Sequence, residues 1–422
     1  MKIAVVGTGY VGLTTALLFA ELGHDVLAID VDEDKVEKIN KGICPIYEPG
    51  AEELLKKHAG KNLRATREYE IEDADVIFIC VGTPSREDGS METKYLENAA
   101  RKIGKRLKNG QIVAVKSTVV PGTTEEFVIP ILEEESSLKQ GEFGVAMNPE
   151  FLREGLAIHD TFHPDRIVIG ERDKRSGDVL ESLYRPLNAP ILRTQIKVAE
   201  MIKYTSNAFL AVKISFANEI ANICERIGVD VYEVMKGVGM DHRISPHFLN
   251  AGAGFGGSCF PKDVKALISL AKRVGYEPRL LEDVLKINDY MPRHVVELAE
   301  KHYGPLKDAK VSVLGLAFKP NTDDIRETRA VIIVEELLKR GARVIGYDPK
   351  AMENFRKLIP HIEYADSAEN AVRSADIVII QADWEEFKKL DFDSFPSLKL
   401  VVDGRRTVSP KKVKYVAIGR GD

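Results

Sequence analysis

Residues 2–30 read KIAVVGTGYVGLTTALLFAELGHDVLAID, and this stretch decides the fold of the N-terminal part of the chain. An apolar run from Lys2 to Val6 is followed by a helical pattern from Val11 to Leu22 and a second apolar run from Asp25 to Asp30. Apolar runs without polar alternation are typical of parallel strands that are buried on both faces. The stretch therefore predicts a strand–helix–strand unit of a parallel sheet.

Three glycines lie between the first strand and the helix, with the spacing Gly-x-Gly-x-x-Gly. The first allows a tight turn, the second lets the backbone approach a pyrophosphate, and the third lets helix and strand pack closely. Asp30 ends the second strand, where a carboxylate binds both ribose hydroxyls and repels a 2′-phosphate, so NAD is favoured over NADP. The alternative is a sheet domain without its cofactor, in which Asp30 is a turn residue. We place the cofactor on Gly7, Gly9, Tyr10, Val11, Gly12 and Asp30.

The same alternation of apolar runs and helical patterns continues along the chain. Runs at 75–81, 112–116 and 144–147 predict further strands of the first sheet. Runs at 310–314, 343–347 and 377–380, with a helical pattern over 329–340, predict a second sheet. The second unit lacks the glycine triplet, because Gly315-Leu-Ala-Phe-Lys319-Pro320 stands in its place.

A helical stretch separates the two predicted sheets. Residues 195–227 contain no Gly and no Pro, and a continuous helix of this length would span roughly 50 Å; residues 264–274 predict another helix. We expect an α/β chain in which a central helical domain with a long helix joins two doubly wound, Rossmann-like parallel-sheet domains. The predicted domains are 1–190, 195–300 and 305–422, with linkers at 186–194 and 303–307.

Composition excludes several classes of protein. Among 422 residues, 60 Lys and Arg oppose 65 Asp and Glu, so the chain lacks the basic field of a nucleic-acid binder or a binder of anionic membranes. The sequence has no run of 18 apolar residues, and its four cysteines form no Cys-x-x-Cys pair. We therefore expect a cytoplasmic protein without a membrane span. His159 and His163 lack a third ligand, so we expect no metal.

One cysteine differs from the others. Cys80 and Cys224 lie in apolar segments and Cys44 has no evident partner, which is typical of inert thiols. Cys259 lies in the segment 252–263, GAGFGGSCFPKD, where Pro261 suits a first helical position and places the cysteine just before a helix. A helix N-terminus and a neighbouring lysine both stabilise a thiolate. Cys259 is therefore a candidate nucleophile; the alternative is an incidental loop cysteine.

The segment 254–263 resembles the catalytic loop of the nucleotide-sugar 6-dehydrogenases, the UDP-glucose/GDP-mannose dehydrogenase family. Nearly the whole chain is similar to this family, in the same order of motifs. The matching segments are Val81-Gly-Thr-Pro84, Ser117-Thr-Val-Val-Pro-Gly122, Asn148-Pro-Glu-Phe-Leu-Arg-Glu-Gly155, Ala199-Glu-Met-Ile-Lys-Tyr204 with Asn207, and Gly315-Leu-Ala-Phe-Lys319.

The resemblance implies an enzyme that oxidises the sixth carbon of UDP-glucose to a carboxylate, using two NAD and one water. Cys259 would hold the sugar as a thiohemiacetal and then as a thioester. GDP-mannose or a UDP-N-acetylhexosamine is the alternative substrate. A two-electron hydroxyacid-type dehydrogenase and an NAD-binding protein without catalysis are the alternative classes.

The resemblance also assigns roles to individual residues. Lys203 and Asn207, at i, i+4 on one helix face, would stabilise the oxyanion, Asp263 would assist proton transfer, and Glu150 with Thr118 would organise water. The alternatives are a solvated helix face and a turn at 148–150. Further cofactor contacts are Lys35, Thr83, Thr118, Glu154, Lys262 and Arg326. Sugar-nucleotide contacts are Glu150, Phe151, Leu152, Glu154, Lys203, Asn207, Arg243, Phe248, Leu249, Asn250, Gly252, Gly256 and Lys319.

Arg243 resembles an arginine that reaches into a neighbouring subunit's site, which implies a homodimer through the central helical domain. Ser245 stands where the family often has glycine. Lys319 and Arg326 would supply positive charge near the diphosphate; the alternative is solvated surface charge.

Overall fold

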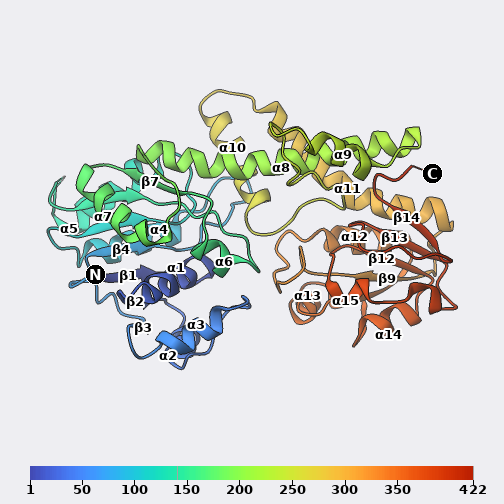
Figure 1. Ribbon diagram of the computed structural model, residues 1–422, viewed down its shortest axis with the longest axis horizontal. Coiled ribbons are helices and arrows are strands. Elements are labelled where there is room, and N and C mark those ends of the chain that lie inside the picture. The colour runs from blue at the N-terminus through green and yellow to red at the C-terminus, as the bar shows by residue number, and fades with distance from the viewer. Residues whose placement is uncertain (140, 422) are drawn as a thin grey trace. The chain divides into compact units, whose positions relative to one another are not determined.

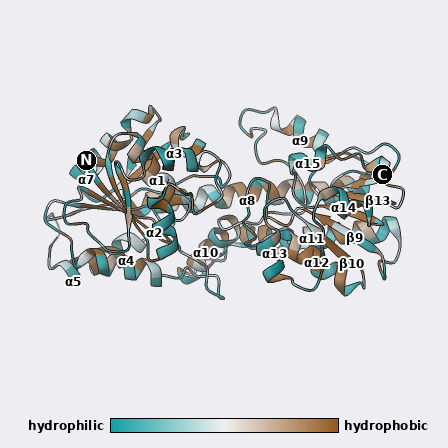
Figure 2. Ribbon diagram, turned by 90° about the horizontal axis from the view of Figure 1, so that it is seen from below, coloured by the Kyte–Doolittle hydropathy of each residue, from teal (hydrophilic) through white to brown (hydrophobic). Residues whose placement is uncertain are grey.

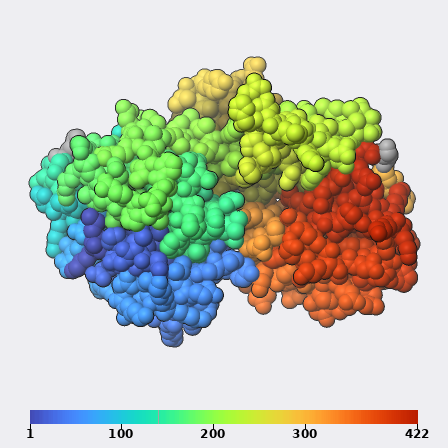
Figure 3. Space-filling view, in the orientation of Figure 1, coloured from blue at the N-terminus to red at the C-terminus, as the bar shows by residue number. Residues whose placement is uncertain are grey.

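The computed structural model describes residues 1–139 and 141–421. The chain forms two compact units, Met1–Ser206 and Asn207–Asp422, and the boundary falls within the long helix α8, Ile196–Ile227 (Figures 1 and 3). Among the described residues, no helix combines the length and the apolar character needed to cross a membrane.

An eight-stranded sheet forms the centre of the first unit, with the order β3-β2-β1-β4-β5-β6-β7-β8. All neighbouring strands are parallel except β6 and β7. The strands are β1 (Lys2–Val6), β2 (Asp25–Ile29), β3 (Leu63–Thr66), β4 (Val76–Ile79), β5 (Ile112–Val115), β6 (Gly144–Met147), β7 (Ile167–Glu171) and β8 (Ile191–Thr194). The helices are α1 (Tyr10–Glu21), α2 (Glu33–Asn40), α3 (Ala51–His58), α4 (Lys94–Gly104), α5 (Ile129–Ser136), α6 (Ala157–Phe162) and α7 (Lys174–Tyr184), with a π-helical turn at Thr124–Val128.

Helices cover both faces of this sheet. Ile3 and Val5 of β1 pack into one hydrophobic cluster with α1, α3 and α7, whereas Ala4 and Val6 pack into another with α4, α5 and the start of α8. Successive strand residues point to opposite faces, so a strand buried on both sides must be apolar at every position. The strands of this sheet are accordingly brown in Figure 2.

The second unit contains a six-stranded, fully parallel sheet with the order β11-β10-β9-β12-β13-β14. Its strands are β9 (Lys310–Leu314), β10 (Arg343–Tyr347), β11 (Glu363–Tyr364), β12 (Ile377–Ile380), β13 (Leu400–Asp403) and β14 (Lys414–Ala417). Its helices are α9 (Val231–Gly239), α10 (Phe260–Arg273), α11 (Arg279–Tyr303), α12 (Arg329–Lys339), α13 (Met352–Leu358), α14 (Ala368–Arg373) and α15 (Glu385–Lys388). α11 packs with α12 in the hydrophobic cluster on one face of this sheet.

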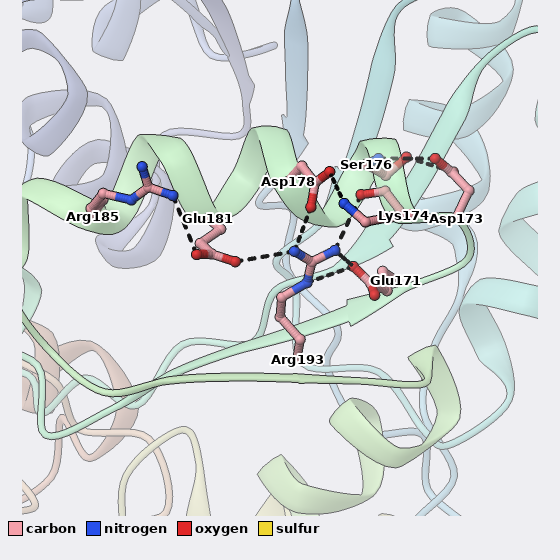
Figure 4. Close-up of polar contacts among 8 residues, drawn as sticks. All are labelled: Glu171, Asp173, Lys174, Ser176, Asp178, Glu181, Arg185 and Arg193. Carbon is pink, nitrogen blue, oxygen red and sulfur yellow. Dashed lines mark hydrogen bonds and ion pairs between the residues drawn. The ribbon is translucent and has the colours of Figure 1, made fainter.

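The predicted fold class is confirmed: the chain is α/β, with two Rossmann-like sheets and a central helical region. The prediction of a linker over 186–194 is wrong in part, because β8 occupies its second half and extends the first sheet beside β7. β8 is an edge strand whose Arg193 donates to Glu171 of β7 and to Asp178 and Glu181 of α7 (Figure 4). Its partly exposed residues lack the continuous apolar pattern that identified the central strands.

Candidate active site

The glycine loop after β1 forms a cradle for a phosphate group. Gly7 has φ +93°, and a Cβ on Gly12 would lie 1.7 Å from the Gly7 carbonyl oxygen, so neither position accepts a larger residue. A Cβ on Gly9 would meet nothing within 4 Å, which leaves open space at the N-cap of α1. Backbone N–H groups at this helix N-terminus therefore face a space that suits a pyrophosphate.

Asp30 lies beside this loop at the end of β2. Its Oδ2 accepts hydrogen bonds from the backbone N–H of Thr8 at 2.8 Å and the Thr8 hydroxyl at 2.6 Å, and the Lys35 ammonium lies 3.9 Å away. Burial alone would raise the pKa of Asp30, but the hydrogen bonds from Thr8 and Asp32 outweigh it and lower the pKa. The carboxylate is thus charged at neutral pH, as a ribose-binding carboxylate must be.

The order of strands places this loop at a switch point of the sheet. β1 lies between β2 and β4, so the connections from β1 and β4 run to opposite sides, and nucleotides bind in such crevices. Thr83 after β4 donates to the backbone carbonyl of Thr118 after β5, at 2.8 Å. The structure therefore brings together two residues that were predicted separately as cofactor contacts.

Lys203 and Glu150 form a buried ion pair, with Nζ and Oε1 3.0 Å apart. Glu150 follows β6 and Lys203 lies on α8, and both side chains are less than a tenth exposed. Burial would raise the pKa of Glu150, but the Lys203 ammonium and the backbone N–H of Leu152 lower it. The Phe151 ring lies beneath the Lys203 ammonium, 5.3 Å from its centre, and beneath Arg166 at 3.8 Å. Sequence reasoning had grouped Lys203 with Asn207 and Glu150 with Thr118, and did not foresee this pairing.

The first unit contains two further buried charged residues whose roles sequence reasoning missed. Lys116 at the end of β5 donates to the Asn148 amide oxygen at 3.0 Å and the Tyr184 hydroxyl at 3.2 Å, and burial lowers its pKa to about 8. Glu200 on α8 accepts from the backbone N–H groups of Gly122 at 2.6 Å and Thr124 at 2.9 Å. Glu200 thereby ties the loop that carries Thr118 to the helix that carries Lys203. Both residues stood inside matched or apolar segments, but only their tertiary partners reveal a role.

In the second unit, Cys259 is the N-cap residue of α10, as predicted, and Pro261 occupies the second helical position rather than the first. The Cys259 side chain is partly accessible and lies 3.5 Å from the Ser258 hydroxyl. Cys80, in contrast, is buried, and burial raises the pKa of its thiol to about 12. The accessible cysteine at a helix start is therefore the better placed nucleophile.

Asn207 and Asp263 form the second polar pair. Asn207 on α8 donates to Asp263 Oδ2 at 2.6 Å, and the ammonium of Lys262 lies 2.6 Å from Asp263 Oδ1. The Asp263 side chain is 1% exposed and lies in the first turn of α10, one turn after Cys259. The first turn of α10, which follows the thiol, thus carries a buried carboxylate that is hydrogen-bonded to an amide of α8.

The loop before Cys259 requires glycine at two positions. A Cβ on Gly256 would lie 2.3 Å from the Glu327 carbonyl oxygen, and one on Gly257, which has φ +84°, would lie 2.7 Å from the Phe318 ring. A Cβ on the predicted contact Gly252 would lie 2.5 Å from the Gly404 carbonyl oxygen. The segment is therefore fixed by close backbone packing.

Except for Leu249, these remaining predicted residues are partly or fully exposed. Lys319 lies 5.5 Å from the Phe318 ring centre, and Arg326 is exposed and donates to Asp324. Arg243 is exposed and donates to Asp241, and Ser245 has φ +69°, a conformation that glycine adopts more readily than serine. Phe151, Leu152, Glu154 and Phe248 are partly exposed, Leu249 is buried and Asn250 is exposed.

A phosphate cradle with a ribose-binding carboxylate at the switch point of the sheet, together with an accessible thiol at a helix start, is the equipment of an NAD-dependent oxidoreductase, and this chain is one. Its N-terminal residues 1–188 match the NAD binding domain of the UDP-glucose/GDP-mannose dehydrogenase family, residues 197–290 the central domain and residues 312–410 the UDP binding domain. The chain therefore belongs to the UDP-glucose/GDP-mannose dehydrogenase family, and NAD is its cofactor.

Known proteins resemble the chain over its full length. A UDP-glucose 6-dehydrogenase of Haloferax volcanii is 47% identical over 98% of this chain and 98% of its own length. A solved UDP-glucose dehydrogenase of Pyrobaculum islandicum has a TM-score of 0.93 and 43% identity, covering 99% of this chain and 97% of its own. A solved UDP-D-ManNAc dehydrogenase of Pyrococcus horikoshii has a TM-score of 0.90 and 33% identity, covering both chains completely.

Proposed function

We propose that this enzyme oxidises UDP-glucose to UDP-glucuronate in two steps, with two NAD⁺ and one water consumed. The observation that carries the proposal is the accessible Cys259 at the N-cap of α10, next to the Asn207–Asp263 pair. The name and 47% identity of the Haloferax volcanii relative support UDP-glucose as the sugar nucleotide. The C-terminal match to a UDP binding domain supports a uridine nucleotide.

The chemistry balances with a thiol as the only covalent catalyst. Bound NAD⁺ supplies the hydride acceptor for both oxidations. The C6 alcohol loses a hydride and a proton and becomes an aldehyde, and the Cys259 thiolate attacks C6 to form a thiohemiacetal. Loss of a second hydride and a proton from this adduct leaves a thioester. Water then breaks the C6–S bond, which regenerates the thiol and yields the carboxylate, so that the overall reaction releases two NADH and three protons.

The remaining roles in the reaction belong to polar side chains of both units. Lys203 and Asn207 stabilise the negative oxygen on C6, because a buried ammonium and a buried amide are strong hydrogen-bond donors. Asp263 moves protons through water, and Glu150 with Thr118 positions the water that hydrolyses the thioester. The cofactor contacts Lys35, Thr83, Glu154, Lys262 and Arg326 and the sugar-nucleotide contacts stay part of this proposal.

An apolar strip on α8 supports a homodimer. Phe209, Phe216, Ile223 and Ile227 recur at helical spacing and are between 49% and 65% exposed in the single chain. A contiguous apolar face of this kind marks a contact with another protein. We propose that two chains associate through this strip, with Arg243 serving the partner's site. The cytoplasmic location and the three-domain division given above are also part of the proposal. Sedimentation of the protein and of Phe216→Glu tests the dimer, and two monomeric species would reject it.

The experiment that tests the function measures NADH formed per sugar nucleotide consumed, with UDP-glucose, UDP-N-acetylmannosamine and GDP-mannose side by side. We expect two NADH per UDP-glucose and slower turnover of the others. One NADH per sugar would indicate a two-electron enzyme, and none would indicate a binding protein. The similarity to the Pyrococcus horikoshii UDP-D-ManNAc dehydrogenase makes an N-acetylhexosamine the second candidate, and preference for it would replace UDP-glucose.

A further inference from the structure

The loop that precedes Cys259 is held by hydrogen bonds from several segments of its unit. Residues 251–257 are all buried. Asn218 accepts from the Gly252 N–H, the Gly404 carbonyl from the Ala253 N–H and the Arg326 carbonyl from the Gly257 N–H, while Arg405 donates to the Gly254 carbonyl and Asn288 binds Phe255.

Asn288 makes the one contact in this set that uses both halves of a side-chain amide. Its Oδ1 accepts from the Phe255 N–H at 2.6 Å, and its Nδ2 donates to the Phe255 carbonyl at 3.0 Å. Asn288 lies on α11 and is 1% exposed. The amide therefore binds Phe255 as a neighbouring strand would, and a carboxylate of the same shape would place a negative oxygen against the Phe255 carbonyl.

Phe255 connects this clamp to the helix that carries the thiol. Its ring meets the ring of Phe260, the first residue of α10, edge to face with the centres 5.9 Å apart. Gly256 and Gly257 separate Phe255 from Ser258 and Cys259, and glycines add little stiffness of their own. A Cβ on Gly254 would lie 2.7 Å from Asn288 Oδ1, so loop and amide are in close contact. The position of the thiol thus depends on where Phe255 is held.

We propose that Asn288 is a positioning residue for the reaction, which sets the place of the Cys259 thiol by clamping the backbone of Phe255. This inference rests on the proposed function, because it assumes that Cys259 captures the aldehyde. A misplaced thiol still permits the first hydride transfer, which needs no sulfur. The specific consequence of losing the clamp is therefore release of aldehyde in place of uronate.

The test compares Asn288→Asp with the wild-type enzyme, with NAD⁺ and UDP-glucose as the probes. Asn288→Asp keeps the shape but cannot donate to the Phe255 carbonyl when ionised. We expect kcat for uronate to fall roughly 10- to 100-fold, with KM for NAD⁺ changed less than about threefold. NADH per sugar should fall from two toward one, with the missing product trapped as aldehyde by a hydrazine. Alkylation of the Cys259 peptide by iodoacetamide, followed by mass spectrometry, should change in rate as well.

Asn222→Asp is the matched control, because Asn222 is a half-buried amide on α8 that donates to Met291 of α11 and not to the loop. It should keep two NADH per sugar even if it lowers the melting temperature. Asn288→Ser, which shortens the side chain and removes the paired bonds to Phe255, replaces Asn288→Asp if that variant does not fold. Two NADH per sugar and wild-type alkylation in the Asn288 variants would overturn the inference alone, whereas one NADH per sugar in the wild-type enzyme would overturn the proposed function.

Discussion

The two sheets of this enzyme have the same arrangement of their first strands but different residues at the places where a ligand could bind. β1 pairs with β2 and β4 as β9 pairs with β10 and β12, in parallel throughout. Both first strands end in a glycine with positive φ, +93° at Gly7 and +91° at Gly315. Each of these glycines donates its N–H to the end of the neighbouring strand, to Ile29 at 2.7 Å and to Tyr347 at 2.8 Å.

A carboxylate follows β2 in the first sheet and β10 in the second, and the two carboxylates differ in their hydrogen-bond partners. Asp30 accepts hydrogen bonds from the backbone N–H and the hydroxyl of Thr8 and from the backbone N–H of Asp32, beside the open space at Gly9. Asp348, at the corresponding place, is 1% exposed and accepts five hydrogen bonds, from the N–H groups of Leu316, Ala317, Lys350, Ala351 and the Trp384 indole. A carboxylate whose oxygens are all occupied cannot bind a ribose diol. A shared topology therefore does not imply a shared ligand.

The loops after the two glycines differ as well. α1 begins at Tyr10, directly after the glycine loop, whereas α12 begins only at Arg329. Residues 316–328 fill the interval in the second unit and carry Lys319 and Arg326. The first unit thus has a helix N-terminus at this place, which suits a phosphate, whereas the second has the two side-chain cations for which we propose a role near the diphosphate.

The largest expected effect comes from Gly12→Ala. The added Cβ would lie 1.7 Å from the Gly7 oxygen, so the loop must move. We expect the dissociation constant for NAD⁺ to rise at least about 100-fold and the free energy of unfolding to fall by roughly 3 kcal/mol. Gly315→Ala, whose Cβ would lie 2.6 Å from Ala382, is the matched control: it should lose stability and keep its NAD⁺ affinity. Equal loss of NAD⁺ affinity in both variants would contradict the division between the sheets.

The second prediction compares the removal of each of the two carboxylates. Asp30→Ala should weaken NAD⁺ binding about 10- to 100-fold with a loss of stability of only about 1 kcal/mol. Asp348→Ala leaves five donors, four of them buried, without their acceptor, so the free energy of unfolding should fall by roughly 3 kcal/mol with NAD⁺ binding unchanged. Isothermal titration and denaturant unfolding measure the two quantities. Weaker NAD⁺ binding by Asp348→Ala than by Asp30→Ala would contradict the different roles given to the two carboxylates.

The smallest effect concerns pH and the buried Lys116. Burial lowers its pKa from 10.5 to about 8, so above pH 8 the folded protein releases a proton that the unfolded chain still binds. Stability due to this residue must therefore rise with pH between about 8 and 10.5. Relative to Lys116→Met, the wild-type protein should gain about 2 kcal/mol between pH 7.5 and pH 10 in denaturant unfolding. A difference that does not change with pH would show that Lys116 has an ordinary pKa.

Sequence alone predicts those features that local pattern determines. The apolar runs of β1 and β9, the glycine triplet and the helix start at Cys259 are all visible in neighbouring residues. β8 was missed because its edge position makes it half polar. The pairs Lys203–Glu150 and Asn288–Phe255 join segments far apart in the chain, so no spacing indicates them. A buried Glu or Asn in a helix has the same letters as a solvated one, and only packing distinguishes the two.

The proposed mechanism requires one thiol to hold the half-oxidised sugar, and uronate formation by Cys259→Ala is the direct test of this requirement. The variant is incubated with saturating NAD⁺ and UDP-glucose, and uronate is quantified by mass spectrometry. We expect the variant to bind both ligands and to form no uronate. Uronate at the wild-type rate would contradict the mechanism.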